Sequence, residues 1–178
     1  MQTEIIISGF GGQGVLFAGQ LISYAAMDSN LEVTWIPSYG PEMRGGTANC
    51  TVVVSDEEIG APVVRNPEIA LVLNLPSLDK YEETLQTGGL MVINSSMVNR
   101  LPNREDIKIV SIPGNEIAEK IGNKRVLNMV MLGAMFANHK VLPLSAIEKA
   151  LHDHLPARHH GFLQANIEAL RAGNTYLS

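Results

Sequence analysis

Short, unbroken apolar runs alternate along the first two thirds of this chain with stretches whose apolar residues recur at helical spacing. A continuous apolar run is typical of a strand buried on both faces of a sheet, whereas recurrence every three or four residues is typical of a helix. The expected strands are residues 5–7, 31–36, 47–55, 69–73, 90–93 and 107–112. The expected helices are residues 13–29, 77–85, 115–121, 124–139, 144–154 and 159–173. This order predicts a three-layer α/β fold, with a mostly parallel sheet, flanking helices and a helical C-terminal third.

Residues 47–55 are expected to interrupt the parallel arrangement. They contain the β-branched run TVVV at 51–54, and the charged turn DEE follows at 56–58. Such a turn allows a short antiparallel return that ends at Ile59, so we expect a mixed sheet.

Local signals predict where several elements begin and end. Residues 37–46, PSYGPEMRGG, contain two prolines and three glycines and are expected to form a loop. Ser77 is expected to cap the helix of residues 77–85, and Gly173 is expected to end the last helix.

No repeat, low-complexity tract or linker divides the chain, so residues 1–178 are expected to form a single domain. Residues 124–139 include VLNMVMLGAMFA and are apolar nearly all round the expected helix. Such a helix is either buried in the core or covered by a partner, and burial in the core is the default expectation.

Composition excludes several classes of protein. The formal net charge is −5 and no basic run carries interleaved aromatic residues, so we expect no nucleic-acid partner. The single cysteine, Cys50, cannot hold an iron–sulfur cluster alone and is expected to be a small buried apolar residue. No apolar run is long enough to span a bilayer and the N-terminus lacks the form of a signal peptide, so we expect a cytoplasmic protein without membrane contact.

The segment EIIISGFGGQG at residues 4–14 joins a strand to a helix through four glycines within six residues. Glycine lets the backbone adopt positive φ and approach another group closely. The helix that follows presents unpaired N–H groups and the positive end of its dipole, which suits a phosphate or a carboxylate. The glycines could equally serve only to make a tight turn.

A dinucleotide site is one alternative, because Gly9, Gly11 and Gly14 satisfy the pattern GxGxxG. That pattern also requires an acidic residue about 20 positions further on, at the tip of the second strand. The second strand ends here as Trp35-Ile36-Pro37-Ser38, without such a residue. A plain anion- or nucleotide-binding module is a further alternative.

The glycine turn GFGGQG is followed about thirty residues later by SYGPEMRGG at residues 38–46. Together the two segments resemble the gamma subunit of the 2-oxoacid:ferredoxin oxidoreductases, which act on pyruvate, 2-oxoisovalerate, 2-oxoglutarate or indolepyruvate. The resemblance continues through NMVMLGA at residues 128–134 and through residues 166–173, and covers nearly the whole chain.

The resemblance implies a subunit of an enzyme rather than an enzyme active alone. The complex oxidatively decarboxylates a 2-oxoacid with coenzyme A, giving acyl-CoA, carbon dioxide and reduced ferredoxin. Thiamine diphosphate and magnesium lie between the alpha and beta subunits, and iron–sulfur clusters lie in the beta or a ferredoxin-like delta subunit. This chain is expected to bind no cofactor alone and to pack on those subunits. A short separate gamma chain resembles the 2-oxoglutarate members somewhat more than the others.

Two glycine-rich loops carry the expected contacts with a ligand or a partner subunit. The strands of residues 5–7 and 31–36 that precede them are expected to be neighbours in a βαβ unit, so both loops are expected at the carboxyl edge of the sheet. Their residues are Gly11, Gly12, Gln13, Gly14, Tyr39, Arg44, Gly45 and Gly46. Arg44 supplies a planar fork suited to carboxylate or phosphate, although it could instead pair with Glu42. Whether these loops contact coenzyme A or only a partner subunit stays open, and no catalytic residue is expected.

Four of the five histidines gather around Pro156, which raises the possibility of a metal site. They are His152, His154, His159 and His160. Their spacing is not that of a ligand pair on one helix face and no cysteine accompanies them, so we expect a solvated helix end instead.

Overall fold

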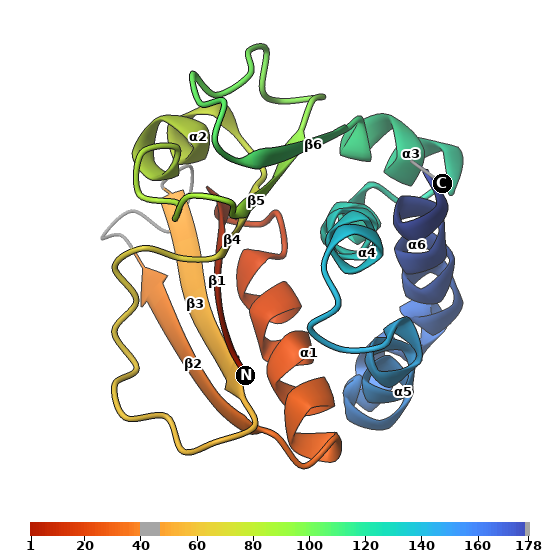
Figure 1. The fold of residues 1–178 in the computed structure, drawn as a ribbon. Helices are drawn as coiled ribbons and strands as arrows, with labels where there is room; N and C mark the ends of the chain where they lie inside the picture. Colours follow the sequence, from red (N-terminus) through yellow and green to blue (C-terminus); the bar gives the residue numbers. More distant parts are fainter. Residues whose placement is uncertain (40–46, 177–178) are drawn as a thin grey trace.

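The computed structural model of this protein describes residues 1–39 and 47–176, with Tyr39 described by its backbone alone. Within these residues a six-stranded sheet has the order β2-β3-β1-β4-β5-β6 (Figure 1). The strands are β1 (Gln2–Phe10), β2 (Glu32–Tyr39), β3 (Thr47–Ser55), β4 (Ile69–Val72), β5 (Leu90–Asn94) and β6 (Lys108–Ile112). Strands β1, β4, β5 and β6 are parallel to one another, whereas β3 is antiparallel to both of its neighbours. The predicted mixed, mostly parallel sheet is confirmed.

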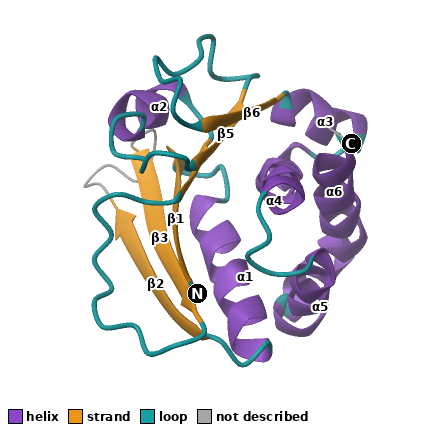
Figure 2. Ribbon diagram, in the orientation of Figure 1, coloured by secondary structure: helices purple, strands orange, loops and turns teal. Residues whose placement is uncertain are grey.

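The helices are α1 (Val15–Asp28), α2 (Leu75–Tyr81), α3 (Gly114–Lys120), α4 (Leu127–Asn138), α5 (Leu144–His154) and α6 (Leu163–Thr175). Two 3₁₀ turns, η1 (Lys124–Val126) and η2 (Ala157–Phe162), lead into α4 and α6. Helices α1, α4, α5 and α6 lie together beyond one face of the sheet, and α2 lies on the other side (Figure 2). The expected three layers and the helical C-terminal part are therefore present. Several helices cover one face of the described sheet, whereas α2 covers the other.

Alternation along the strands divides the core between these two faces. Ile5 and Ile7 of β1 belong to the large cluster under α1 and α4, whereas Ile6 belongs to a smaller cluster with Leu78 of α2. Every residue of β4 and β5 is buried, as a strand covered on both faces requires. The unbroken apolar runs of the sequence are explained by this double cover.

Strand β2 differs from the sequence-based expectation in length and in place. Pro37 and Ser38, expected in a loop, continue the strand and pair with Cys50 and Asn49 of β3. Proline is tolerated there because β2 is an edge strand within the described sheet, so its missing N–H removes no bond to a second neighbour. The β1–α1–β2 segment was expected to place β1 and β2 side by side; β3 lies between them instead.

The expected antiparallel return after residues 56–58 is wrong. Residues 56–68 contain no strand, and β3 obtains its antiparallel partners from β1 and β2. The charged turn therefore ends the strand without making a hairpin.

Helix α2 is capped by Asn74 rather than by Ser77. The side-chain Oδ1 of Asn74 accepts a hydrogen bond of 2.9 Å from the Ser77 N–H, and Pro76 occupies the first turn, where a missing N–H costs nothing. The helix ends at Tyr81 and not near Leu85.

Helix α4 is the buried centre of the helical layer. Residues 127–136 are all buried, which confirms burial in the core as the reason for the all-round apolar pattern. Gly133 of α4 and Gly173 of α6 let the two backbones touch: a Cβ on Gly133 would overlap the Leu170 carbonyl, and one on Gly173 would overlap the Val130 carbonyl. Gly173 was expected to end the last helix, but α6 continues through it to Thr175 because this glycine is needed for close packing.

Candidate functional site

The carboxyl ends of β1 and β4 form a topological switch point. The two strands are parallel neighbours, yet α1 leaves β1 toward one face of the sheet and α2 leaves β4 toward the other. In open α/β sheets, ligands bind in the crevice outside such a point. The glycine turn, residues 9–14, lies at this place in the fold (Figure 1).

Two glycines of the turn have left-handed backbone conformations. Gly12 has φ 95° and Gly14 has φ 76°, values that side chains rarely permit. The space around Gly12 is open, since a Cβ there would meet nothing within 4 Å. Gly14 instead lies against Asn128 of α4, whose Nδ2 donates to the Gly14 carbonyl at 3.1 Å. One side of the turn is therefore anchored on α4 and the other, at Gly11 and Gly12, is exposed.

Gln13 holds the turn together from within. Its Oε1 accepts a hydrogen bond of 2.6 Å from the Phe10 N–H, and its Nε2 lies 3.4 Å from the Leu73 carbonyl. The side chain expected to contact a ligand or a partner is thus used inside the turn. The Gln13 side chain therefore shapes the turn through its hydrogen bond with the Phe10 N–H.

The N-terminus of α1 is electrostatically open to an anion. Gly14 caps the helix without a side-chain bond, and no acidic residue lies in the first turn. The first intrahelical bond runs from the Ala18 N–H to the Gly14 carbonyl, so the N–H groups of residues 15–17 have no helical acceptor. Orphan donors at the positive end of a helix favour a negative group.

The strand register brings the ends of β1 and β2 and the start of β3 to the same edge of the sheet. Thr47, the first residue of β3, pairs with Phe10 at the end of β1, and Ala48 pairs with Tyr39 at the end of β2. The common edge was predicted, although the reason given for it, direct pairing of β1 with β2, was wrong. Arg44, Gly45, Gly46 and the Tyr39 side chain lie outside the described residues.

The same register changes the neighbourhood that a dinucleotide would need. In a dinucleotide-binding fold the second strand lies beside the first, and its tip carries the acidic residue that binds the ribose. Here the antiparallel strand β3 lies beside β1, and β2 is one strand further out. The glycine pattern is present without the βαβ pairing on which its usual function depends.

Two asparagines at this edge were missed by sequence reasoning. Asn94, fully buried at the end of β5, donates to the Leu73 carbonyl at 3.3 Å and accepts from the Gly114 N–H at 3.1 Å. Asn74 caps α2, and its buried Nδ2 has no partner among the described residues. The signal available in the sequence was an Asn directly after, or at the end of, each of two buried apolar runs.

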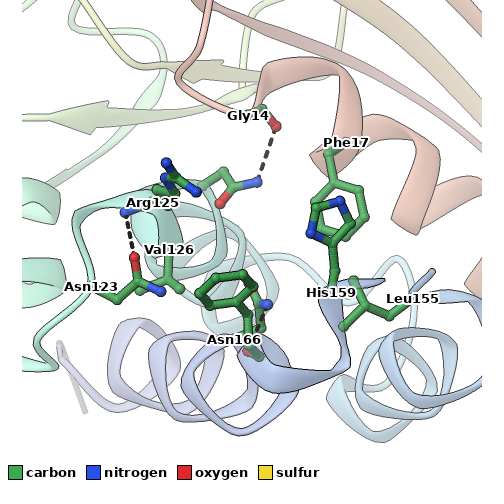
Figure 3. Close-up of a pocket in the computed structure, with 10 residues that line it drawn as sticks. Gly14, Phe17, Asn123, Arg125, Val126, Leu155, His159 and Asn166 are labelled. Carbon is green, nitrogen blue, oxygen red and sulfur yellow. Dashed lines mark hydrogen bonds between the residues drawn. The ribbon is translucent and has the colours of Figure 1, made fainter. Parts of the chain in front are cut away.

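A cavity of about 360 Å³ adjoins the glycine turn on the helical side of the sheet. Figure 3 shows Asn123, Arg125 and Val126 on one side, with Phe17, His159 and Leu155 opposite them. The described residues that line it are Gly14, Phe17, Asn123, Arg125, Val126, Asn128, Leu155, His159, Phe162 and Asn166. Sequence reasoning did not find this cavity, because its walls come from α1, η1, α4, η2 and α6.

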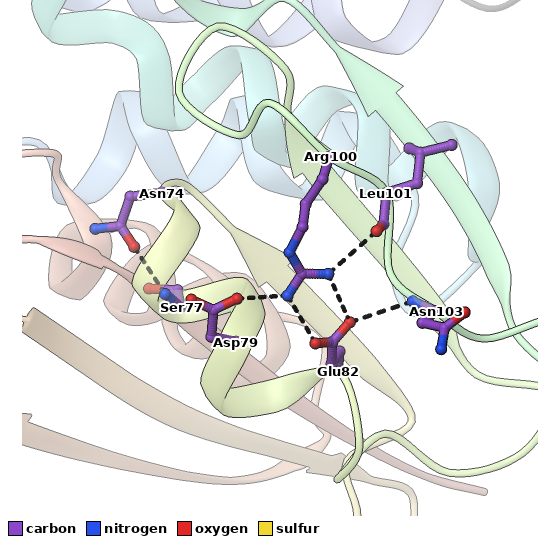
Figure 4. Close-up of polar contacts among 7 residues, drawn as sticks. All are labelled: Asn74, Ser77, Asp79, Glu82, Arg100, Leu101 and Asn103. Atoms are coloured by element: carbon purple, nitrogen blue, oxygen red, sulfur yellow. Dashed lines mark hydrogen bonds and ion pairs between the residues drawn. The ribbon is translucent and has the colours of Figure 1, made fainter.

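An ion-pair cluster on the opposite face has a structural explanation. Arg100 contacts Asp79 and donates to both carboxylate oxygens of Glu82, at 2.7 and 3.0 Å (Figure 4). The Arg100 guanidinium lowers the pKa of Glu82 below its usual value. The cluster ties the connection between β5 and β6 to the end of α2.

The histidines expected near a helix end have separate environments. His154 stacks on Tyr24, with ring centroids 4.3 Å apart, and contacts Asp28 at 2.9 Å. His160 contacts the Leu155 carbonyl at 2.8 Å, whereas His159 lines the cavity. Across residues 1–39 and 47–176, no three His, Cys, Asp or Glu side chains gather closely enough to hold a metal ion. In the same residues no helix has the length and apolar character needed to cross a bilayer.

Fold and turn together define a class: an open, mixed α/β sheet with a glycine turn at its switch point. The sequence model of one family, described as pyruvate ferredoxin/flavodoxin oxidoreductase, matches residues 4–176. The chain belongs to this family.

Similar proteins include separate subunits and part of a longer chain. The 2-oxoglutarate synthase subunit KorC of Methanothermobacter marburgensis is 37% identical over 180 residues, covering 97% of this chain and 95% of that protein. The ketoisovalerate oxidoreductase subunit VorA of Methanothermobacter thermautotrophicus is 40% identical over 136 residues. That match covers 76% of this chain but only 28% of VorA, so this chain matches about a quarter of that relative's length.

A solved structure shows the same fold over nearly the whole chain. The gamma subunit of a keto/oxoacid ferredoxin oxidoreductase from Geobacter sulfurreducens has a TM-score of 0.86 and 30% sequence identity. The match covers 98% of this chain and 95% of that chain.

Proposed function

We propose that this chain is the gamma subunit of a multi-subunit 2-oxoacid:ferredoxin oxidoreductase. The observation that carries the proposal is the end-to-end match with separate subunits of such enzymes, at 97% coverage of this chain by KorC and 98% by the Geobacter sulfurreducens gamma subunit. The reaction is the oxidative decarboxylation of a 2-oxoacid with coenzyme A to acyl-CoA, carbon dioxide and reduced ferredoxin. Among 2-oxoacids, 2-oxoglutarate is favoured, because KorC matches this chain along its whole length.

The cofactors of the reaction belong to partner subunits in this proposal. Alpha and beta chains hold thiamine diphosphate and magnesium, and a beta or delta chain holds the iron–sulfur clusters. Cys50 does not fit cluster ligation: it is fully buried, and burial raises the pKa of its thiol to about 11, which disfavours the thiolate that a metal needs. This chain contributes to the arrangement of the complex and supplies no cofactor of its own. It acts in the cytoplasm and has no nucleic-acid or membrane partner.

The glycine turn and the loop of residues 39–46 are the proposed contact with coenzyme A or a partner. The turn offers exposed backbone at Gly11 and Gly12 and the unpaired N–H groups at the start of α1. Tyr39 is the last residue of β2, and Arg44, Gly45 and Gly46 follow it in the sequence before β3 begins. Together they suit an anionic group such as a coenzyme A phosphate.

Assembly and turnover test the assignment of the chain as a subunit. Co-expression with alpha- and beta-type chains from the same source should give one complex that reduces ferredoxin in the presence of coenzyme A. Four substrates should be compared: 2-oxoglutarate, pyruvate, 2-oxoisovalerate and indolepyruvate. The chain alone should show no activity, and a complex that assembles and turns over equally well without it would refute the proposal.

The variant Arg44→Ala tests the role of the loop. Loss of a charge-assisted contact should lower turnover or coenzyme A affinity in the assembled complex about ten- to a hundredfold, and Arg44→Lys should recover only part of it. Arg65→Ala, at an exposed arginine outside both loops, is the matched control and should behave as wild type. Unchanged kinetics for Arg44→Ala in a fully assembled complex would limit this loop to a scaffolding role.

A dinucleotide-binding protein is the alternative function. The glycine pattern favours it, but the place of β3 beside β1 and the absence of an acidic residue in Trp35–Ser38 do not. We therefore propose the oxidoreductase subunit.

A further inference from the structure

The two outer strands of the described sheet differ in how well their edges are protected. Strand β2 lies at one end of the sheet and contains Pro37, a residue that discourages pairing with a further strand. Strand β6 lies at the other end (Figure 1), and its sequence, KIVSI, contains no proline. An unprotected edge strand presents unpaired N–H and C=O groups with which another extended segment can pair.

The hydrogen bonds of β6 show which of its backbone groups are free. The Lys108 N–H donates to the Gly89 carbonyl at 2.8 Å, so the backbone of Lys108 faces β5. Backbone groups alternate in direction along a strand, so those of Ile109 and Ser111 point away from β5. Within the described part of the chain no strand lies on that side of β6, and Ser111 is exposed.

An open groove of about 420 Å³ lies beside this edge. It is lined by residues of β6 and of the loop that follows β5, namely Ser95, Val98, Asn99, Arg100, Leu101 and Ser111. In this loop Leu101 is 60% exposed and Met97 is 40% exposed. The ion pairs of Arg100 hold the loop against α2, and Leu101 points away from them (Figure 4). The groove therefore has a wall fixed by ion pairs and exposed apolar side chains at its rim.

The chemistry of this surface fits an extended polypeptide segment. Its free groups are backbone donors and acceptors, which an added β-strand satisfies. Ile109 and Ser111 face the same side of the sheet as α2, so alternate side chains of an added strand would reach the groove. Lys108 is exposed and, unlike Lys124 and Lys149, forms no ion pair within the described residues. An acidic residue on the added strand would complement it.

A second copy of this chain is the weaker choice of occupant. Strand β6 has only 5 residues, whereas stable interfaces bury about 1,200–2,000 Å². A strand pair this short therefore needs further contacts, which a larger partner supplies. In VorA, of which the match covers only 28%, a sequence of this kind is joined to further polypeptide.

We propose that β6 and the groove beside it bind an extended segment of a partner subunit, which adds a strand to the described sheet. The segment presents apolar side chains to the groove and an acidic side chain to Lys108. This inference rests on the proposed function, because it takes the partner to be an alpha or beta chain of the same enzyme. It involves neither the glycine turn nor the loop of residues 39–46.

Hydrogen exchange in the free chain and in the assembled complex tests the proposal directly. In the free chain the amides of Ile109 and Ser111 have no acceptor in the described sheet and should exchange quickly. In the complex with co-expressed alpha and beta chains, the peptide that covers residues 108–112 should gain two amides that exchange about tenfold more slowly or slower still. The mostly exposed residues 60–66 are the internal control and should keep their exchange rates.

Two substitutions test the edge and the groove separately, with binding to the alpha and beta chains measured by surface plasmon resonance. Ser111→Pro removes an outward N–H and should weaken binding about three- to tenfold, whereas Ser111→Ala keeps that N–H and should bind as wild type. Leu101→Asp brings a charge to the apolar rim and should weaken binding about tenfold. Val63→Asp, at an exposed apolar residue of another loop, is its control. Thermal denaturation of each free variant checks that the fold is kept.

The outcomes separate this inference from the proposed function. A complex that assembles and turns over while both amides exchange as fast as in the free chain would overturn the inference and leave the proposed function standing. Slow exchange in the free chain, together with the mass of two copies in sedimentation, would show a second copy at this edge and overturn it as well. Binding unchanged by both Ser111→Pro and Leu101→Asp would have the same consequence. Failure to form any complex with the alpha and beta chains would overturn both.

Discussion

At the scale of single residues, Gln13 shows how a polar side chain in a glycine turn can act on the turn itself. Its acceptor satisfies the Phe10 N–H, which a tight turn would otherwise leave unpaired in a partly buried place. The open face of the turn is left to backbone N–H groups and to Gly11 and Gly12.

Replacement of Gln13 by Ala should therefore destabilise the fold. The lost bond to the partly buried Phe10 N–H is expected to lower the free energy of unfolding by about 1–3 kcal/mol, measured by urea denaturation. Gln13→Glu retains the acceptor for the Phe10 N–H but places a second carboxylate oxygen against the Leu73 carbonyl, so it should recover only part of that loss. Equal stability of wild type and Gln13→Ala would show that the bond is not important for the turn.

Cys50 is a second residue whose environment decides its chemistry. It is fully buried beneath α1, where its Sγ lies 3.5 Å from the Val15 carbonyl, and burial raises the pKa of the thiol to about 11. At pH 8 the thiol should stay protonated and inaccessible, so a thiol reagent should label the folded chain far more slowly than the chain in urea. Because Cys50 is the only cysteine, the labelling is unambiguous. Rapid complete labelling of the native protein would contradict this environment.

At the scale of elements, the contact between α4 and α6 holds the helical layer together. Their backbones approach at Gly133 and Gly173, and both positions lack room for a methyl group. Such close contact lets α4 stay buried between the sheet and α6, as residues 127–136 show. The position of the glycine turn depends on α4 as well, because the Asn128 side chain donates a hydrogen bond to the Gly14 carbonyl.

Alanine at either glycine should force these helices apart. Gly133→Ala and Gly173→Ala are each expected to lower the free energy of unfolding by about 1–3 kcal/mol or more, measured by denaturant unfolding. Gly60→Ala is the matched control, since a Cβ there meets nothing within 4 Å, and should change stability by less than about 0.5 kcal/mol. If all three variants were equally stable, the close helix contact would be wrong.

At the scale of the whole molecule, the order of the strands decides which ligands the glycine turn can accept. An antiparallel strand, β3, occupies the place beside β1 where a dinucleotide-binding fold has its second parallel strand. The carboxyl edge has the glycine turn and the open N-terminus of α1, but β1 has no parallel second strand beside it to supply the residue that binds a ribose. This distinction follows from topology and not from the glycine pattern.

Titration with NAD and NADP should accordingly show no binding at the turn tighter than about millimolar, equivalent to about 4 kcal/mol. Micromolar affinity for either dinucleotide would instead support the dehydrogenase alternative.

The sequence by itself determined the class of fold, most element positions and the family resemblance. The apolar runs are unbroken because β4 and β5 are covered on both faces, and α5 shows helical spacing because it is covered on one face. Both patterns can therefore be read from neighbouring residues in the sequence. Residues 47–55 and 144–154 were predicted with the bounds that β3 and α5 have. The paired glycine segments are also local, and they sufficed for the resemblance.

Tertiary structure alone decided the neighbours of each element. The residues near Pro37 do not indicate that β2 is an edge strand of the described sheet, and the residues near β1 do not indicate that β3 pairs with β1. Both arrangements depend on contacts between residues far apart in sequence. Gly173 resembles a helix stop until α4 is placed against it. The cavity is the clearest case, because Phe17, Arg125 and Phe162 are separated by many residues and come together only when α1, η1 and η2 pack. The preference of a segment for helix or strand depends on neighbouring residues, whereas strand pairing and cavities result from the packing of the whole chain.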